Sequence, residues 1–201
     1  FNQIYTNYVK HQRVFDVIYF PDGNALYSYE GVVFLNSVKE ICGILRKYIV
    51  KEQLINPDDV TIICADNKEN LRELHKVHRK LCIANSIPKA DEPHTTWTFV
   101  TRTAFEGVDF YSPSASTYVI ANYNVSSLSL DIASDIPQIV GRQRRKDNPF
   151  RNTVHLFYKD NKQQLYDNEF NASQAEKMQE SQRQIEIWNS APMECKQIAL
   201  N

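Results

Sequence analysis

The feature that most constrains the fold is a repeated alternation of short apolar runs with longer segments of helical spacing. The run at 31–35 is apolar throughout, and it leads through Asn36 and Ser37 into 38–48, where apolar residues recur at helical spacing. A continuous apolar run bounded by turn residues is typical of a strand buried on both faces of a parallel sheet. The pattern recurs along the chain and predicts strands at residues 31–35, 60–64, 97–101, 118–121 and 153–158.

Strands that alternate with helices predict an α/β protein of three layers, in which helices cover both faces of a parallel sheet. One predicted helix spans 66–82, and its apolar stripe consists of Leu71, Leu74, Val77 and Leu81. Another spans 138–145 and lies at the carboxyl edge of the sheet. Ligands bind at this edge in open α/β sheets, so we expect the functional residues there.

Three parts are predicted along the chain. Residues 1–29 are a lead-in without clear periodicity that ends in a candidate hairpin, formed by 14–20 and 25–29. Residues 30–160 are the α/β domain. Residues 161–201 are rich in Gln, Asn, Glu and Ser with a weak apolar stripe at helical spacing, and this pattern predicts a helical C-terminal extension.

Composition narrows the class of protein. A chain of 201 residues with 42% hydrophobic and 23% charged residues suits one globular domain with an extension. Its net charge of −1 means that any surface for nucleic acid must be a local basic patch. The four cysteines are widely spaced, and no apolar run approaches the ~20 residues that cross a bilayer. We therefore expect a cytoplasmic protein with reduced thiols and no membrane contact. Because the chain begins at Phe1, we also expect it to be a piece of a longer protein.

The segment 134–145 combines helix-start residues with a group of cations. The helix-start residues are Ser134, Asp135 and Pro137. At 3.6 residues per turn, one face of the predicted helix would present the side chains of Gln138, Arg142 and Arg145. Arg144 would point off this face. Arginine binds phosphate oxygens in a bidentate fork and stays charged at any working pH, so the pattern favours anion binding.

Two patterns in this region resemble motifs of superfamily 2 helicases. T-x-x-A-x-x-G-V-D resembles motif V, and it is formed by Thr101, Ala104, Gly107, Val108 and Asp109. Q-x-x-G-R-x-x-R resembles motif VI, and it is formed by Gln138, Gly141, Arg142 and Arg145. Either pattern alone is moderately specific, but both in this order and at this spacing are strong. The initial Gln is similar to the DExH and viral or phage-type branches, and the resemblance covers residues 30–160 as the second RecA-like lobe.

The resemblance implies a role for each matching residue. In such enzymes ATP with magnesium lies between two RecA-like lobes, and the first, missing lobe supplies the phosphate loop and the metal ligands. Arg145 would be the arginine finger, Arg142 a second phosphate contact, and Gln138 a hydrogen-bond partner near the γ-phosphate. Gly107, Asp109 and Gly141 would line the nucleotide side and couple the two motifs. The implied partners are the first lobe and nucleic acid, with DNA favoured over RNA.

Ser37 and Thr101 follow predicted strands and would contact the nucleic-acid backbone by the same resemblance. For Ser37 a second interpretation needs no ligand, since Ser37-x-x-Glu40 is a capping box, and the two roles are compatible.

Three further alternatives remain open from the sequence. His75, His78 and Cys82 lie near one helical stripe, but without a fourth ligand at a suitable spacing they are better explained as helix residues. Residues 91–94 spell D-E-x-H, yet they lie in a loop in a chain that lacks any G-K pair, so we interpret the match as a coincidence. The whole domain could also be a RecA-like module that binds nucleic acid or protein without hydrolysing ATP.

Overall fold

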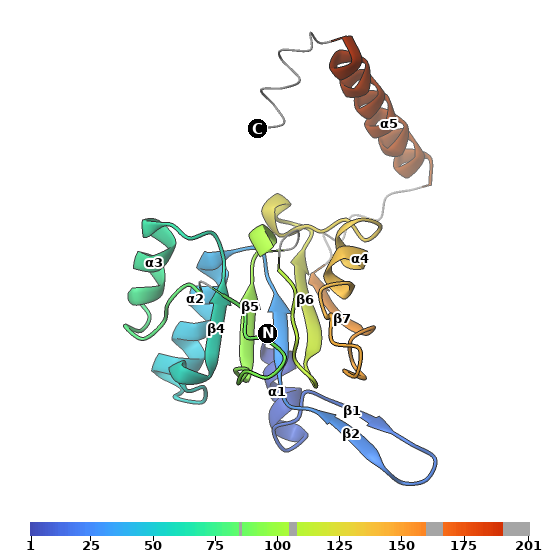
Figure 1. Cartoon of the computed structure of the whole chain (residues 1–201). Helices are drawn as coiled ribbons and strands as arrows, with labels where there is room; N and C mark the ends of the chain where they lie inside the picture. Colours follow the sequence, from blue (N-terminus) through green and yellow to red (C-terminus); the bar gives the residue numbers. More distant parts are fainter. Residues whose placement is uncertain (85, 105–107, 160–166, 191–201) are drawn as a thin grey trace. The chain divides into compact units, whose positions relative to one another are not determined.

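The computed structural model describes residues 1–84, 86–104, 108–159 and 167–190, and divides the chain into two compact units, Phe1–Asn161 and Lys162–Asn201. A five-stranded sheet with the order β4-β5-β3-β6-β7 forms the centre of the first unit (Figure 1). All four strand pairings are parallel. The strands are β3 (Gly31–Phe34), β4 (Val60–Ile63), β5 (Trp97–Val100), β6 (Ser116–Asn122) and β7 (Val154–Lys159). The predicted parallel α/β sheet is confirmed, with boundaries that differ by one or two residues.

One face of the sheet, called here the first face, is covered by three helices. They are α1 (Asn2–Lys10), α2 (Val38–Leu45) and α3 (Lys68–His75). Alternate strand residues such as Val33 and Phe99 point to this face and pack with Ile41, Leu45 and Leu74. The chain runs from β3 through α2 to the edge strand β4. It then runs through α3 to Ile83, which pairs in parallel with Ile62 of β4. Both helices therefore cover the same face.

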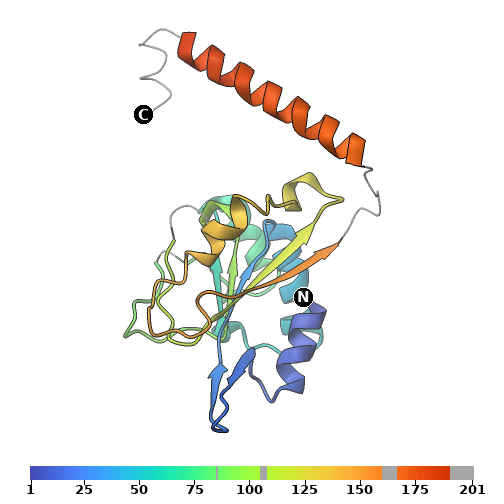
Figure 2. The same ribbon diagram turned by 90° about the vertical axis from the view of Figure 1, so that its right-hand side faces the viewer.

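The opposite face, called the second face, is covered by α4 (Asp135–Val140) together with loops (Figure 2). Its core contains Val32, Phe34 and Val119 from the strands, packed against Ile139 of α4 and Phe110 of the segment after β5. Helices on both faces make the three layers of a RecA-like α/β fold. The loop 86–96 and the chain between α4 and β7 also lie over this face.

The N-terminal residues differ from the sequence-based prediction. The predicted lead-in contains α1, whose Ile4 is buried, and Phe1 packs against Trp97 and Phe99 of β5. Phe1, Tyr5 and Tyr8 recur at helical spacing, but the polar residues between them weaken the apolar periodicity by which a helix is predicted. The predicted hairpin is confirmed as β1 (Asp16–Tyr19) paired antiparallel with β2 (Ala25–Ser28).

Several helix boundaries also differ. The helix predicted over 66–82 ends at His75, and turns place Val77 and Leu81 in the same core as Leu74. After α2 the chain continues as a π-helix, Arg46–Lys51, and short 3-10 turns occupy Pro57–Asp59, Arg102–Ala104 and Ser126–Leu128. The second unit contains α5 (Asp167–Ser190), in agreement with the predicted helical extension.

Candidate functional site

The segments that resemble motifs V and VI lie side by side over the second face. Phe110 forms an isolated parallel bridge with Gln143, in which the Phe110 amide donates to the Arg142 carbonyl at 2.8 Å. The Arg144 amide donates to the Phe110 carbonyl at 2.9 Å. These backbone bonds fix the two motif-like segments in one register.

This bridge overturns the predicted helical face of Gln138, Arg142 and Arg145. Helix α4 ends at Val140, with Gly141 as its C-cap, so the two arginines lie beyond the helix. Glycine weakens helix continuation, and the backbone groups of 142–144 find partners in the segment at Phe110 instead. Gln138 remains on α4 and is exposed.

The carboxylate of Asp109 binds two arginines. It accepts from Arg144 Nε at 2.9 Å, and Arg142 Nη1 lies 3.5 Å away at the outer limit of a hydrogen bond. The expectation that Arg144 points away from the site is therefore wrong, because the extended backbone turns it toward the same acid as Arg142. Asp109 thus joins the two motif-like segments through side chains as well as through the backbone.

Arg145 turns in a different direction. Its Nε and Nη2 donate to the two carboxylate oxygens of Asp147 at 2.7 and 3.0 Å, and its Nη1 donates to the Ala90 carbonyl at 2.6 Å. The hydrogen bonds to Asp147 raise the pKa of Arg145 and lower the pKa of Asp147. The Asp147 side chain is 65% exposed, so this pair is a surface ion pair of small net energy.

Gln143 and Arg142 each leave a buried polar atom without a protein partner. The Gln143 side chain is buried, and its Nε2 donates to the Thr117 hydroxyl at 3.4 Å. Its Oε1 and the Nε of Arg142 have no hydrogen-bond partner. Gln143 stands at a variable position of the motif-like pattern, so the sequence alone indicates no role for it. The unpaired Arg142 N–H is a buried donor, which an ordered water molecule can satisfy.

An open cavity of 430 Å³ lies beside Asp109, at the carboxyl end of β4. Ile63, Ile87, Val108 and Tyr111 contribute to its lining. The lining mixes these apolar side chains with Ser86 and Asp109, and neither Arg142 nor Arg144 contributes to it. A phosphate in this cavity would meet the Asp109 carboxylate before the arginines, so the cavity itself does not fit an anion. Gly107 lies outside the described residues.

A second polar cluster at the carboxyl edge joins three strand ends. Both Asp135 carboxylate oxygens accept from Arg102 Nη2, at 3.1 and 3.2 Å. The Asn36 side chain accepts from the Arg102 amide at 2.9 Å and donates to the Ser127 carbonyl at 2.8 Å. Arg102 thereby ties the segment after β5 to the first turn of α4. Arg102 stands at a variable position of the pattern that resembles motif V, so the pattern indicates no role for it. The signal that could have identified this cluster is that its polar residues directly follow buried strands.

The two residues predicted to contact nucleic acid have different environments. Ser37 caps α2, since its hydroxyl accepts from the Glu40 amide at 3.2 Å, and the N-cap is confirmed. The Ser37 amide donates to the Leu35 carbonyl at 2.7 Å, so the reciprocal bond of a capping box is not formed. Thr101 is 5% exposed and points its hydroxyl toward the Ile63 carbonyl. Burial leaves the Thr101 side chain little surface for a ligand. The contact of both side chains with nucleic acid stays a prediction.

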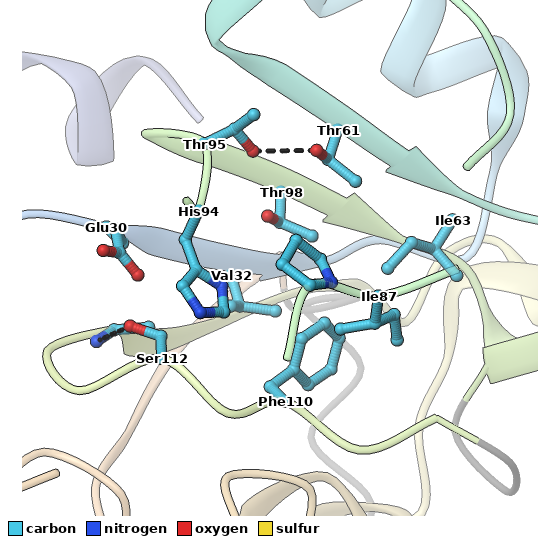
Figure 3. Close-up of a pocket in the computed structure, with 12 residues that line it drawn as sticks. Glu30, Val32, Thr61, Ile63, Ile87, His94, Thr95, Thr98, Phe110 and Ser112 are labelled. Carbon is cyan, nitrogen blue, oxygen red and sulfur yellow. Dashed lines mark hydrogen bonds between the residues drawn. The ribbon is translucent and has the colours of Figure 1, made fainter. Parts of the chain in front are cut away.

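The D-E-x-H sequence does not converge on one point. The Glu92 carboxylate accepts from the Lys89 amide at 2.8 Å, whereas His94 lines a small cavity of 20 Å³ between the loop and the sheet. Figure 3 shows the His94 ring in the same hollow as the Glu30 carboxylate, and both groups have a buried atom without a partner. The space is sufficient for about one water molecule. The pattern is thus part of a packed loop.

Among the residues that the structure describes, no His, Cys, Asp or Glu side chains form a group of three that could hold a metal ion. The described helices also include none with the length and hydropathy needed to cross a bilayer. Comparison with known proteins found no matching family model, no matching curated protein and no matching solved structure.

Proposed function

We propose that this chain is the second motor lobe of an ATP-dependent helicase or translocase that acts on nucleic acid, with DNA favoured over RNA. The observation that supports this most is the pairing of the two motif-like segments through Asp109, Arg142 and Arg144. In the sequence, Asp109 is 33 residues from Arg142 and 35 residues from Arg144. A motor lobe must couple the state of its bound nucleotide to its contact with nucleic acid. A direct link between the two segments provides a physical connection for that coupling.

In this proposal the arginines neutralise charge that develops on the phosphoryl group of ATP. The nucleotide would bring magnesium, and the first lobe would supply the phosphate loop and the metal ligands. Arg145 is the candidate finger, because its present partner Asp147 is exposed and can be exchanged for a phosphate at little cost. The Arg142 side chain is only 16% exposed. It therefore suits a phosphate contact at a fixed position better than the role of a finger that must extend toward the nucleotide. Gln138 is exposed on α4 and is proposed to bind near the γ-phosphate.

The proposal is tested by ATP hydrolysis in the protein that contains both lobes. Arg145→Ala should lower kcat by a factor on the order of 10³ or more and change KM for ATP by less than about tenfold. The loss falls on the rate because a finger meets charge that is greatest in the transition state. Arg142→Ala and Arg144→Ala should each reduce kcat and also raise KM, since each removes one of the two arginine partners of Asp109.

Lys146→Ala is the matched control, since Lys146 is a neighbouring exposed cation. It should stay near the wild-type rate. The 201-residue chain alone should hydrolyse no ATP. Loss of activity in Arg144→Ala with full activity in Arg145→Ala would transfer the finger role to Arg144. If none of the three arginines affects the rate, the alternative of a non-hydrolysing binding module replaces the motor.

A further inference from the structure

The hairpin β1–β2 exposes an unusual set of large side chains. Its exposed large residues are Tyr19, Phe20, Leu26, Tyr27 and Tyr29. Tyr19 is 74% exposed and Tyr29 is 57% exposed, so these rings are available to a partner. A group of neighbouring exposed aromatic residues on one element marks an interaction surface more often than scattered apolar residues do.

Three of the tyrosines lie on one face of the hairpin. Val17 pairs with Tyr27 and Tyr19 pairs with Ala25, and residues directly opposite each other in an antiparallel pair point to the same face. Tyr29 follows two residues after Tyr27, and the two ring centroids are 6.3 Å apart. Leu26 pairs with Ile18 and therefore lies on the other face. We call the surface of Tyr19, Tyr27 and Tyr29 the tyrosine face.

Cations border the tyrosine face. An open concavity of 370 Å³ separates the hairpin from the end of α1, and Lys10, His11, Tyr19 and Tyr27 contribute to its lining. Arg13 follows in the same turn and is exposed. The acidic residue that lines the concavity, Asp16, is held by His155 Nε2 at 2.9 Å. A ligand that combines planar rings with negative charge fits this surface.

The base of the hairpin is fixed to the domain, although a two-stranded hairpin alone is marginally stable. The Phe15 amide donates to the Ser28 carbonyl at 2.8 Å, and the Tyr118 hydroxyl donates to the Phe15 carbonyl at 2.7 Å. The Phe15 ring packs on Trp97 with a centroid distance of 4.6 Å. The hairpin consequently projects beyond the sheet in a fixed direction, at the end where β3 begins (Figures 1 and 2).

We propose that the tyrosine face binds single-stranded nucleic acid by stacking on its bases, while Lys10 and Arg13 bind the adjacent phosphates. Stacking of bases on aromatic side chains is tolerant of sequence, because every base has a planar face. The cations next to the rings favour a polyanion over an apolar protein surface. The inference rests on the proposed function in one respect only, that the chain acts on nucleic acid, and it places a contact on a surface that neither motif-like segment contributes to.

The experiment measures binding of fluorescent single strands of 20 deoxythymidines to the 201-residue chain by anisotropy, at low and at moderate salt. An abasic strand of the same length provides the same phosphates without bases. We expect the wild-type chain to bind the thymidine strand about tenfold or more tightly than the abasic strand. Raising the salt should weaken both complexes, as phosphate contacts do.

The variant Tyr19→Ala/Tyr27→Ala/Tyr29→Ala should lose this preference for bases and bind both strands alike. Replacement of the same three residues by Phe should retain it, because the rings remain. Leu26→Ala, on the other face, is the matched control and should change affinity less than about twofold. Circular dichroism checks that each variant stays folded.

Equal wild-type affinity for the two strands, or no binding of either, overturns the inference without the need for a variant. A preference for bases that survives the alanine substitutions also overturns it, and the motor proposal then stands with its strand bound elsewhere. Conversely, tyrosine-dependent binding by this chain, together with an absence of ATP hydrolysis in the protein that contains both lobes, would overturn the motor proposal and leave this surface assigned.

Discussion

At the scale of single residues, burial decides which side chains can react. Cys42 and Cys64 are buried, whereas Cys82 is exposed. Burial raises the pKa of Cys64 from its ordinary value of 9.0 to about 11, and it also raises the pKa of Cys42. Because the thiolate is the reactive form, the two buried thiols are protected in two ways: reagents cannot reach them, and their raised pKa keeps them protonated.

We therefore expect iodoacetamide at pH 8 to modify Cys82 in the folded chain and to leave Cys42 and Cys64 unmodified until urea unfolds the protein. Peptide mass spectrometry measures each site separately. The pKa of Cys64 is higher in the folded state than in the unfolded state, so its contribution to stability is complete below about pH 9 and is lost as the pH rises through about 11. Rapid modification of Cys64 in the folded chain would contradict the described core.

At the scale of elements, α1 shows how a segment outside the sheet becomes part of the core. Ile4 is 2% exposed, and the ring centroids of Tyr5 and Tyr48 lie 4.6 Å apart across the contact with the π-helical segment. The Tyr48 hydroxyl donates to the Asn2 side chain at 2.6 Å. The division of the chain at residue 29 therefore does not correspond to a structural boundary, since α1 belongs to the same compact unit as the sheet.

Ile4→Ala should lower the free energy of unfolding by about 2–4 kcal/mol, because it removes buried methyl groups and leaves a cavity. Urea denaturation followed by circular dichroism measures this change. Val9→Ala is the control on the same helix, since Val9 is 51% exposed, and its effect should stay within about 0.5 kcal/mol. Equal effects of the two substitutions would mean that α1 does not pack as described.

At the scale of the whole molecule, the chain is organised as two compact units. Among the residues whose side chains the structure describes, both hydrophobic clusters of the first unit extend no later in the chain than Phe157 of β7. A unit with its own core is expected to fold by itself. The second unit contains the long helix α5, whose described residues include the exposed Met178.

A chain shortened to residues 1–161 should therefore retain the urea midpoint of the full chain, with a change in the free energy of unfolding below about 0.5 kcal/mol. The comparison requires only equilibrium denaturation of the two proteins side by side. A loss of several kcal/mol, or a shortened chain that fails to fold, would show that residues 162–201 contribute to the core of the first unit.

The sequence identified the elements of the sheet because their signals are local. Runs such as 31–35 and 60–64 are apolar enough to require burial on both faces, and turn residues between the hairpin strands mark where the chain reverses. The cap at Ser37 is equally local, since the donor is three residues away. The two helicase-like patterns could be recognised because their spacing is a property of the chain alone.

The placement of the arginines was decided by tertiary structure. Gln138, Arg142 and Arg145 have helical spacing in the sequence, but the backbone of 142–144 bonds to Phe110, about 33 residues earlier in the chain. Local propensity differs little between a helical and an extended form after Gly141, so these distant hydrogen bonds and the burial of Gln143 determine the outcome. Gly31 is a similar case, because a side chain there would collide with the Phe15 ring, a neighbour that the sequence does not reveal. The sequence determined where strands and motifs occur, whereas long-range bonds and packing determined which way each arginine points.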